Sequence, residues 1–182
     1  MSVGLVSSRR AYSGRIIHLD LDRVRFPDGS EGELEMIRHP GASAVVPFLS
    51  DPAGNDPVVL FIRQYRYAAG QFLYEIPAGR LDPGESPADC ARRELREETG
   101  CDAEHLEFLT TIYTTPGFTD ERIHLFMATG LTAGDAQREH DEFIEVERMP
   151  VSQALTRIKE GEISDSKTIV GLLYATGFRM GS

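Results

Sequence analysis

The chain has 182 residues, of which 41% are hydrophobic and 26% are charged, the composition of an ordinary globular domain. Its 29 acidic and 19 basic residues give a net charge of −10, which disfavours binding to a bare nucleic-acid backbone and leaves an anionic substrate to be captured by local arginines or a cation. Two cysteines make no disulfide framework, and the sequence shows neither a secretory signal nor an apolar run that could span a membrane, so we expect a protein of the reducing cytoplasm.

The N-terminal part of the chain predicts short strands joined by turns. Apolar and partly alternating runs are separated by segments rich in proline, glycine and aspartate, which is typical of β structure. The expected strands span residues 15–24, 33–38, 42–49, 58–62 and 72–76. Arginines and tyrosines then gather in residues 63–67, directly after the fourth of these strands.

The clearest helix prediction covers residues 86–99. Ser86 can cap its N-terminus, Pro87 suits the first helical position, and Asp89 is the acidic residue at the third. Gly100 is placed to end the helix. The remaining expected elements are strands near 106–113, 122–128 and 143–148 and helices near 151–160 and 165–176. Strands before and after one strong helix, followed by terminal helices, predict an α+β fold.

Three glutamates, Glu94, Glu97 and Glu98, share one face of this helix, because residues three and four apart lie above one another. Arg93 can pair with Glu97 one turn later, which leaves the other two less compensated. Neighbouring like charges repel, and a hard divalent cation such as Mg²⁺, which prefers oxygen ligands, would relieve that repulsion. The alternative interpretation is a solvated acidic helix face laced with arginines.

The residues around these glutamates resemble the Nudix box. The pattern consists of a glycine, a glutamate after five intervening residues, and after seven more residues a charged run that closes on an apolar position. It is carried here by Gly79, Glu85, Arg93-Glu94-Leu95-Arg96-Glu97-Glu98-Thr99-Gly100 and Cys101. Cysteine stands where the family usually has an aliphatic residue, and it behaves as a small hydrophobic side chain.

The resemblance implies an α/β/α sandwich, with a mixed sheet between helices, and hydrolysis of nucleoside diphosphates linked to another moiety. It also implies dependence on Mg²⁺ or Mn²⁺. By position, Glu94 and Glu98 would be the principal metal ligands, and the carbonyl oxygen of Ala78 would also reach a metal. Glu97 would be a further ligand or the partner of Arg93.

Segments outside the box are similar to the ADP-ribose pyrophosphatase branch of the family. They are residues 63–67, Glu75-Ile76-Pro77-Ala78-Gly79 and Pro116-Gly117-Phe118-Thr119-Asp120-Glu121. In that branch a proline follows the box at a characteristic distance, and Pro116 lies at that distance from Cys101. The resemblance therefore implies hydrolysis of ADP-ribose to AMP and ribose 5-phosphate by metal-assisted attack of water on phosphorus.

Candidate substrate-binding residues lie in these segments. Arg66 is the first choice for a phosphate contact and Arg63 the second, because a guanidinium matches phosphate in a bidentate way. Either could instead pair with one of the many acidic residues. Tyr65 and Phe118 could stack on a base, although aromatic residues beside strand ends are more often part of the core. Glu121 completes the set that we expect to contact substrate.

The family resemblance also implies a general base, usually a glutamate on a loop before a late strand. The acidic run 138–142 precedes an apolar segment and fits that description. We predict Glu142 as the base, with Glu139 in reserve and Glu97 as a further catalytic candidate. The alternative is a solvated acidic loop without chemistry.

Residues 1–40 are expected to form an antiparallel β element that precedes the Nudix hydrolase domain, residues 41–182. In ADP-ribose pyrophosphatases such strands exchange across a two-fold dimer and help to build the partner's substrate pocket. By resemblance we expect a homodimer.

Several other functions remain open at this stage. The chain could cleave another nucleotide sugar such as GDP-mannose, or bind ADP-ribose as a sensor without cleaving it. The complete set of glutamates in the box argues against the sensor, since such modules usually show a degraded box. A nucleoside-triphosphate hydrolase would often be shorter and lack the N-terminal strands. RNA decapping is disfavoured by the negative charge.

Overall fold

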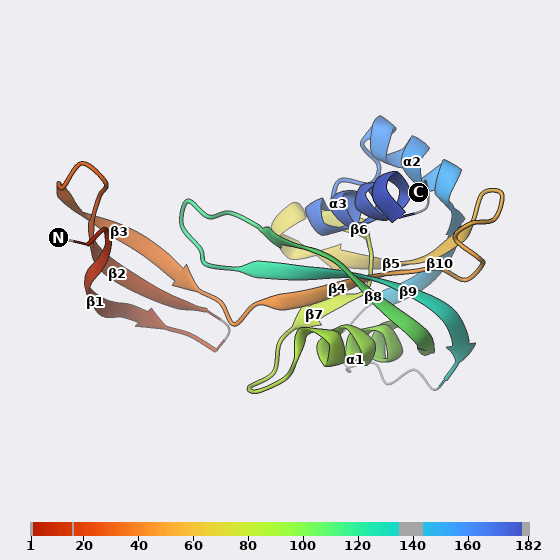
Figure 1. The fold of residues 1–182 in the computed structure, drawn as a ribbon, viewed down its shortest axis with the longest axis horizontal. Coiled ribbons are helices and arrows are strands. Elements are labelled where there is room, and N and C mark those ends of the chain that lie inside the picture. The colour runs from red at the N-terminus through yellow and green to blue at the C-terminus, as the bar shows by residue number, and fades with distance from the viewer. Residues whose placement is uncertain (1, 16, 135–143, 180–182) are drawn as a thin grey trace. The chain divides into compact units, whose positions relative to one another are not determined.

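The computed structural model describes residues 2–15, 17–134 and 144–179 (Figure 1). The chain divides into two compact units. The smaller unit comprises Met1–Gly41 and Tyr113–Arg122, and the larger comprises Ala42–Ile112 and Ile123–Ser182. The units are described separately below.

The smaller unit contains a three-stranded antiparallel sheet. Its strands follow in the order β1 (Gly4–Ser13), β2 (His18–Arg25) and β3 (Glu31–Arg38). The turn between β2 and β3 is held by the Asp28 carboxylate, which accepts hydrogen bonds from the backbone and the hydroxyl of Ser30 at 3.0 and 2.7 Å. The second segment of this unit is tied to β3, because the backbone N–H of Ile37 donates to the carbonyl of Phe118 at 2.8 Å.

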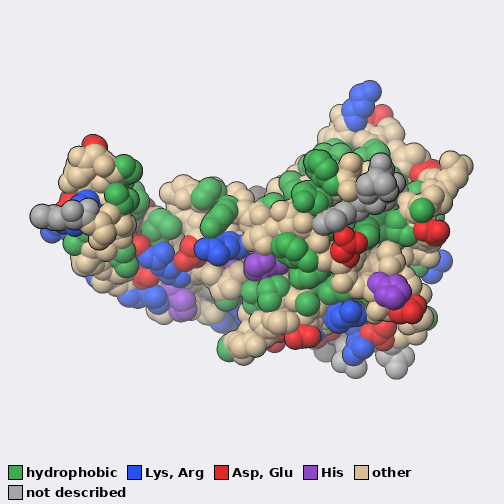
Figure 2. Space-filling model, in the orientation of Figure 1, with side chains coloured by type: hydrophobic (Ala, Val, Ile, Leu, Met, Phe, Trp, Pro, Cys, Tyr) green, Lys and Arg blue, Asp and Glu red, His purple; other side chains and the backbone are tan. Residues whose placement is uncertain are grey.

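Strand β1 is exposed along its whole length. Its side chains include Leu5 and Tyr12, which are 62% and 58% exposed, and hydrophobic side chains on the surface are visible in Figure 2. The first strand expected from the sequence begins at residue 15, so β1 was missed. The reason is physical: neither face of β1 is buried within the chain, so its sequence carries no alternation of apolar and polar residues.

The larger unit contains two sheets. One has four strands in the order β7-β4-β9-β8, in which β4 and β9 are parallel, and the other has three strands in the order β10-β5-β6. The bounds are β4 (Ala42–Pro47), β5 (Val58–Arg66), β6 (Gln71–Glu75), β7 (Ala78–Arg80), β8 (Cys101–Tyr113), β9 (Arg122–Ala133) and β10 (Ile144–Pro150). Strand β7 was not predicted, because its three residues are too few to carry a pattern.

Helices cover the sheets of this unit from two sides. The helices are α1 (Pro87–Thr99), α2 (Val151–Glu160) and α3 (Ser166–Tyr174), with a short 3₁₀ turn at Tyr67–Ala69 and a π-helical turn at Ala175–Arg179. In Figure 1, α1 lies on one side of the strands and α2 and α3 lie on the other. This arrangement confirms the predicted α/β/α sandwich. No helix within the described residues is long and apolar enough to span a membrane.

Strand β4 lies between two hydrophobic clusters, and this placement orients α1. Its residues alternate, as a strand requires: Ala44 and Val46 belong to the cluster shared with α2 and α3, whereas Val45 packs with Ala91 and Leu95 of α1. All five of these side chains are fully buried. The apolar stripe of α1 thus faces the sheet and sets which of its other residues lie beside the backbone of β7.

Helix α1 begins and ends as the sequence predicted. The Ser86 hydroxyl accepts a hydrogen bond from the backbone N–H of Asp89 at 3.1 Å, and Gly100 adopts a left-handed φ of 70°. A side chain at that φ would be strained, so glycine is the residue that suits the position. Asp165 caps α3 in the same way, because its carboxylate accepts from the backbone N–H of Thr168 at 3.0 Å.

Candidate active site

The site begins with two glutamates of α1 that are buried. Glu94 is 9% and Glu98 is 3% exposed, and they stand one turn apart on the same face. Burying ionised carboxylates is unfavourable unless hydrogen bonds or opposite charges compensate. The compensation in this site comes from the backbone of β7 and from Arg93.

The backbone of β7 fits closely against these carboxylates. The N–H of Ala78 donates to Oε2 of Glu98 at 3.0 Å. At Gly79, a Cβ atom would lie 1.8 Å from Oε1 of Glu94, so only glycine leaves room for the Glu94 side chain in this position. Pairing of β7 with β4 fixes Gly79 opposite Ser43 and so positions the backbone that faces the two glutamates. The glycine that opens the sequence pattern therefore allows the Glu94 carboxylate to lie against the backbone of β7.

The Arg93 guanidinium joins three carboxylates of the pattern. It donates to both oxygens of Glu85 at 2.8 and 3.0 Å, to Glu97 at 3.0 Å and to Glu94 at 2.5 Å. It also donates to the carbonyl of Arg80 at 3.1 Å. The expectation that Arg93 would pair with Glu97 and leave Glu94 less compensated was therefore incomplete, because Glu94 shares the same guanidinium.

Glu85 is held as an anion by this contact. The hydrogen bonds from Arg93 outweigh partial burial and, with the backbone N–H of Asp82, lower the pKa of Glu85 to about 2. The same contacts raise the pKa of Arg93. The loop before α1 is thus attached to the helix by a charge-assisted bidentate pair.

The carboxylates fit a hard divalent cation better than any softer metal. Glu94 and Glu98 offer oxygen donors only, which suits Mg²⁺ or Mn²⁺. The Glu94 carboxylate occupies the space that a Cβ of residue 79 would fill. Within the described residues no three His, Cys, Asp or Glu side chains form a ready-made metal cluster, and Glu97 is engaged with Arg93. The protein side chains alone therefore provide a partial donor set, as is usual for Mg²⁺, which keeps water and substrate oxygens.

Arg66, the first choice for a phosphate contact, pairs with a buried glutamate. Its Nε and Nη2 donate to the two carboxylate oxygens of Glu75 at 2.7 and 2.8 Å. Glu75 also accepts a hydrogen bond from Lys167. Burial opposes ionisation of Glu75, but these two cations outweigh it and lower its pKa. The contact with Glu75 raises the pKa of Arg66, and the charge of Glu98 adds to that effect.

Arg63 and Tyr65 lie on an aromatic surface of β5 and β6. The Arg63 guanidinium stands 4.4 Å over the ring of Phe72 and donates to Glu145 at 3.0 Å. Tyr65 meets Phe72 edge-on, with 5.5 Å between the ring centroids, and is 47% exposed. Both predicted contacts are thus on the surface of the larger unit, where an aromatic base could reach Tyr65.

Phe118 and Glu121 lie in the smaller unit. The Phe118 ring is half-exposed, and Glu121 accepts a hydrogen bond from the hydroxyl of Thr114 at 2.8 Å. Nδ1 of His39 lies 3.4 Å from the other Glu121 oxygen. The predicted bases Glu142 and Glu139 lie outside the described residues, and their roles stay predictions.

Sequence reasoning missed Glu75 and Lys167 as members of the site. A weak signal existed for each. Glu75 is the one acidic residue in an otherwise apolar and aromatic strand, and Lys167 is one of only two lysines in the chain. Neither signal names a partner, because the contact spans 92 positions.

Comparisons with known proteins identify the family of the chain. Residues 39–170 match the model of the NUDIX domain. A Bacillus methanolicus protein named methanol dehydrogenase activator is 39% identical over 93% of this chain and 90% of its own length. A Bacillus subtilis protein named ADP-ribose pyrophosphatase is 36% identical over the same shares. A Citrobacter koseri protein named GDP-mannose pyrophosphatase is 42% identical over 64% of this chain and 65% of its own.

A solved structure shares the fold. The crystal structure titled ADP compounds hydrolase superposes with a TM-score of 0.83 at 20% identity and covers 99% of this chain and 97% of its own. The fold, the box and the family match together show that the chain belongs to the Nudix family. It is an enzyme, a hydrolase of that family.

The Glu85–Arg93 pair predicts a pH-dependent contribution to stability. Because the folded pKa of Glu85 is about 2, below its ordinary value of 4.5, the stabilisation is complete above pH 4.5 and is lost as the pH falls toward 2. We expect Glu85→Gln to lower the free energy of unfolding at pH 7 by about 2 kcal/mol. Urea denaturation of both proteins at a series of pH values measures this difference in the free energy of unfolding.

The matched control is Asp82→Asn in the same loop, because the Asp82 carboxylate is 65% exposed and 3.9 Å from Arg93. The free energy of unfolding of Asp82→Asn should stay within about 0.5 kcal/mol of the wild-type value. A difference between wild type and Glu85→Gln that stays constant from pH 7 to pH 3 would contradict the assignment.

Proposed function

We propose that this enzyme hydrolyses ADP-ribose to AMP and ribose 5-phosphate and that the reaction depends on Mg²⁺ or Mn²⁺. The observation that carries the proposal is the pair of buried carboxylates, Glu94 and Glu98, beside the backbone of β7. The single guanidinium of Arg93 donates hydrogen bonds to Glu94, Glu85 and Glu97. The local excess of negative charge favours a bound cation.

The protein groups would divide the work as follows. Glu94 and Glu98 would hold the cation, with the carbonyl oxygen of Ala78 as a further donor. When bound, the metal supplies Lewis acidity, which stabilises charge on the phosphoryl oxygens and lowers the pKa of water. Arg66 would bind and orient the diphosphate through its guanidinium. Glu142, or Glu139 in its place, would accept a proton from the attacking water oxygen.

Glu97 supports this arrangement through Arg93. Its carboxylate accepts from the Nη1 that also reaches Glu94, so Glu97 helps to fix the Glu94 side chain. A base stacked on the exposed ring of Tyr65 and a contact from Arg63 would complete substrate binding in the larger unit, whereas the roles of Phe118 and Glu121 in the smaller unit stay predictions from the resemblance. Stacking of this kind tolerates different bases, so these residues favour a nucleotide without selecting one.

ADP-ribose is preferred over other nucleotide sugars because of the extent of similarity. The Bacillus subtilis ADP-ribose pyrophosphatase matches 93% of the chain, whereas the Citrobacter koseri GDP-mannose pyrophosphatase matches 64%. GDP-mannose is therefore the second candidate. A sensor that binds without cleavage is disfavoured, since the carboxylates of the box are all present.

Turnover of a small substrate panel with Mg²⁺ tests the proposal. The panel comprises ADP-ribose, GDP-mannose, UDP-glucose, a dinucleoside polyphosphate and 8-oxo-dGTP, with products resolved by chromatography. The proposal expects ADP-ribose to have the highest kcat/KM and to yield AMP. A higher kcat/KM for GDP-mannose would overturn ADP-ribose as the preferred substrate but not the proposed hydrolysis of a diphosphate. Binding of ADP-ribose without any product would contradict hydrolysis.

We further propose that residues 1–40 pair two copies of the chain into a homodimer. All ten residues of β1 are exposed, among them Leu5 and Tyr12. The outer edge of β1 pairs with no other strand among the described residues. An apolar edge strand of this length is usually covered by a partner, and a second copy is the commonest one.

The metal-binding role predicts the effect of Glu98→Gln. Loss of one carboxylate should lower kcat for ADP-ribose by at least about 10²-fold, because the cation is held less well. The fold should remain intact, since the amide can still accept from the Ala78 N–H. Steady-state kinetics across a range of Mg²⁺ concentrations and thermal unfolding measure the two effects, with Glu160→Gln at the exposed end of α2 as the control. Normal turnover at saturating Mg²⁺ would remove Glu98 from the site.

The general-base role predicts a different pattern for Glu142→Gln. We expect kcat to fall by about 10²–10⁴-fold while the Mg²⁺ dependence of the rate stays unchanged. Glu139→Gln is the matched control in the same acidic run. If Glu139→Gln proves to be the damaging change, the base is Glu139. If neither variant loses more than about threefold, the proton acceptor is not in this run.

The homodimer predicts the effect of a charge on β1. Leu5→Asp should convert the dimer to a monomer in sedimentation velocity experiments at micromolar concentration, because a buried aspartate without a partner opposes association. Leu173→Asp is the control, since Leu173 is an exposed leucine of α3 in the larger unit. A monomeric wild type, or a dimer that Leu5→Asp leaves intact, would contradict the proposal.

A further inference from the structure

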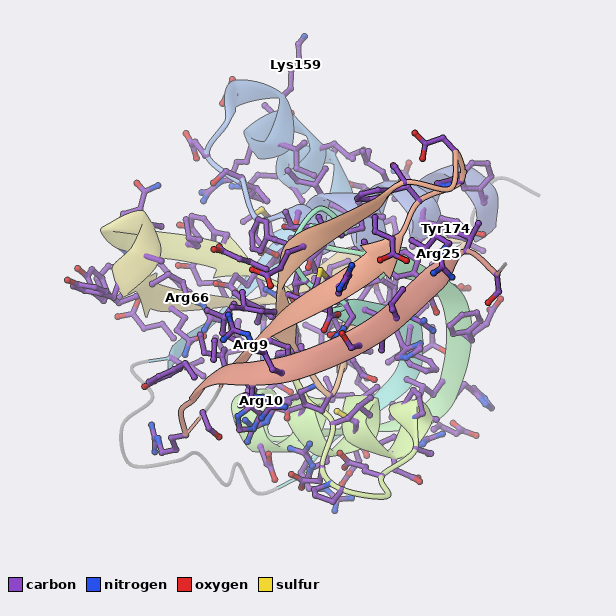
Figure 3. All side chains as sticks on the ribbon, turned by 90° about the vertical axis from the view of Figure 1, so that its left-hand side faces the viewer. Arg9, Arg10, Arg25, Arg66, Lys159 and Tyr174 are labelled. Carbon is purple, nitrogen blue, oxygen red and sulfur yellow. The ribbon has the colours of Figure 1, made fainter. Side chains whose placement is uncertain are left out.

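Three charged side chains of the larger unit meet where β5, β6 and α3 come together. Glu75 ends β6 and is 1% exposed, and Lys167 in the first turn of α3 is 8% exposed. The Arg66 side chain, at the end of β5, is 42% exposed. Arg66 thus reaches from a buried carboxylate to the surface. Its side chain is labelled in Figure 3.

The contacts among these residues hold α3 against the end of β6. Lys167 donates to Oε2 of Glu75, the same oxygen that accepts from Nη2 of Arg66. The neighbouring Thr168 hydroxyl accepts a hydrogen bond from the backbone N–H of Ile76 at 2.8 Å. Lys167 is therefore fixed in place by its own helix, and it has little freedom to leave Glu75.

Arg66 shares its carboxylate partner with a second cation. One cation would suffice to compensate Glu75, but the carboxylate has two. Asp165 also lies 3.1 Å from Lys167. Its charge, however, is already stabilised by the backbone N–H of Thr168 and the N-terminus of α3. Lys167 can therefore balance Glu75 and leave the charge of Arg66 available.

The geometry of Arg66 leaves one edge of its guanidinium for a ligand. The pair with Glu75 uses Nε and Nη2, and in the described part of the chain Nη1 makes no hydrogen bond. A guanidinium held along one edge keeps its donors on the other edge in a fixed direction, which suits a phosphate. The charge of Glu98, a proposed metal ligand, also acts on the Arg66 guanidinium and raises its pKa.

We propose that Lys167 is a positioning residue for diphosphate binding. With Glu75 it holds Arg66 in a fixed orientation, and by balancing the buried carboxylate it keeps the Arg66 charge free for the substrate diphosphate. The inference rests on the proposed function, which assigns the diphosphate contact to Arg66.

A double-mutant cycle between Lys167 and Arg66 tests this inference. The four proteins are wild type, Lys167→Met, Arg66→Gln and the double variant, and the probe is ADP, measured by calorimetry in EDTA. Lys167→Met should weaken ADP binding about tenfold. When Arg66→Gln is already present, Lys167→Met should cause no further weakening, because it acts through Arg66.

Steady-state kinetics with ADP-ribose provide a second measurement. We expect Lys167→Met to raise KM about tenfold while kcat stays within about threefold, since the interaction stabilises the bound substrate and the transition state alike. Lys167→Arg should restore ADP affinity to within about threefold, because it keeps the charge. Lys159→Met, which changes the other lysine of the chain, is the matched control and should have no effect. Lys159 is exposed on α2 and projects away from the body of its unit in Figure 3.

The outcomes separate the inference from the proposed function. Additive losses in the double variant, or unchanged ADP affinity in Lys167→Met, would show that Lys167 is merely structural. Absence of ADP binding to wild type would also overturn the inference. ADP binding that depends on Lys167, without hydrolysis of ADP-ribose, would overturn only the proposed function. If Lys167→Met does not fold, Lys167→Gln removes the charge, keeps a donor for Glu75 and takes its place in the cycle.

Discussion

The contact on which the site depends is the one between Arg93 and its carboxylates. A single guanidinium holds Glu85 in the loop, Glu94 and Glu97 on α1, and the carbonyl of Arg80 at the end of β7. Because the donors of a guanidinium lie in one plane, these groups cannot move independently. Loop, helix and strand therefore form one rigid frame around the buried glutamates, which is what a site for a positioned cation requires.

Packing decides which way that frame faces. Leu95 and Ala91 bind α1 to Val45 of β4, and β4 in turn pairs with β7. The helix is thereby rotated so that Glu94 and Glu98 meet the backbone of Ala78 and Gly79. The hydrophobic stripe and the acidic face of α1 both follow from the helical repeat, which places residues three and four apart on one side. A substitution that rotated α1 would move both carboxylates away from β7 without touching either.

Features with local signals were predictable from the sequence, and those that depend on distant partners were not. Ser86 and Gly100 determine the ends of α1 through contacts within a few residues, and both were recognised. Strand β1 carries no alternation because the chain buries neither of its faces. The pairing of Glu75 with Lys167 joins positions 92 residues apart, and no spacing rule describes such a contact. The family resemblance supplied what local physics lacks, namely which carboxylates are proposed to hold a metal.

Two arginines in the larger unit show how the surroundings of a charge determine its use. Arg93 donates hydrogen bonds to three carboxylates and a carbonyl, so it holds the elements of the site together. Arg66 meets one carboxylate, along one edge, and a lysine shares the compensation of that carboxylate. Its remaining edge is the one that we propose for the diphosphate, because Glu75 already fixes the first. The same residue type thus holds the frame together in one place and, in our proposal, binds the substrate in the other.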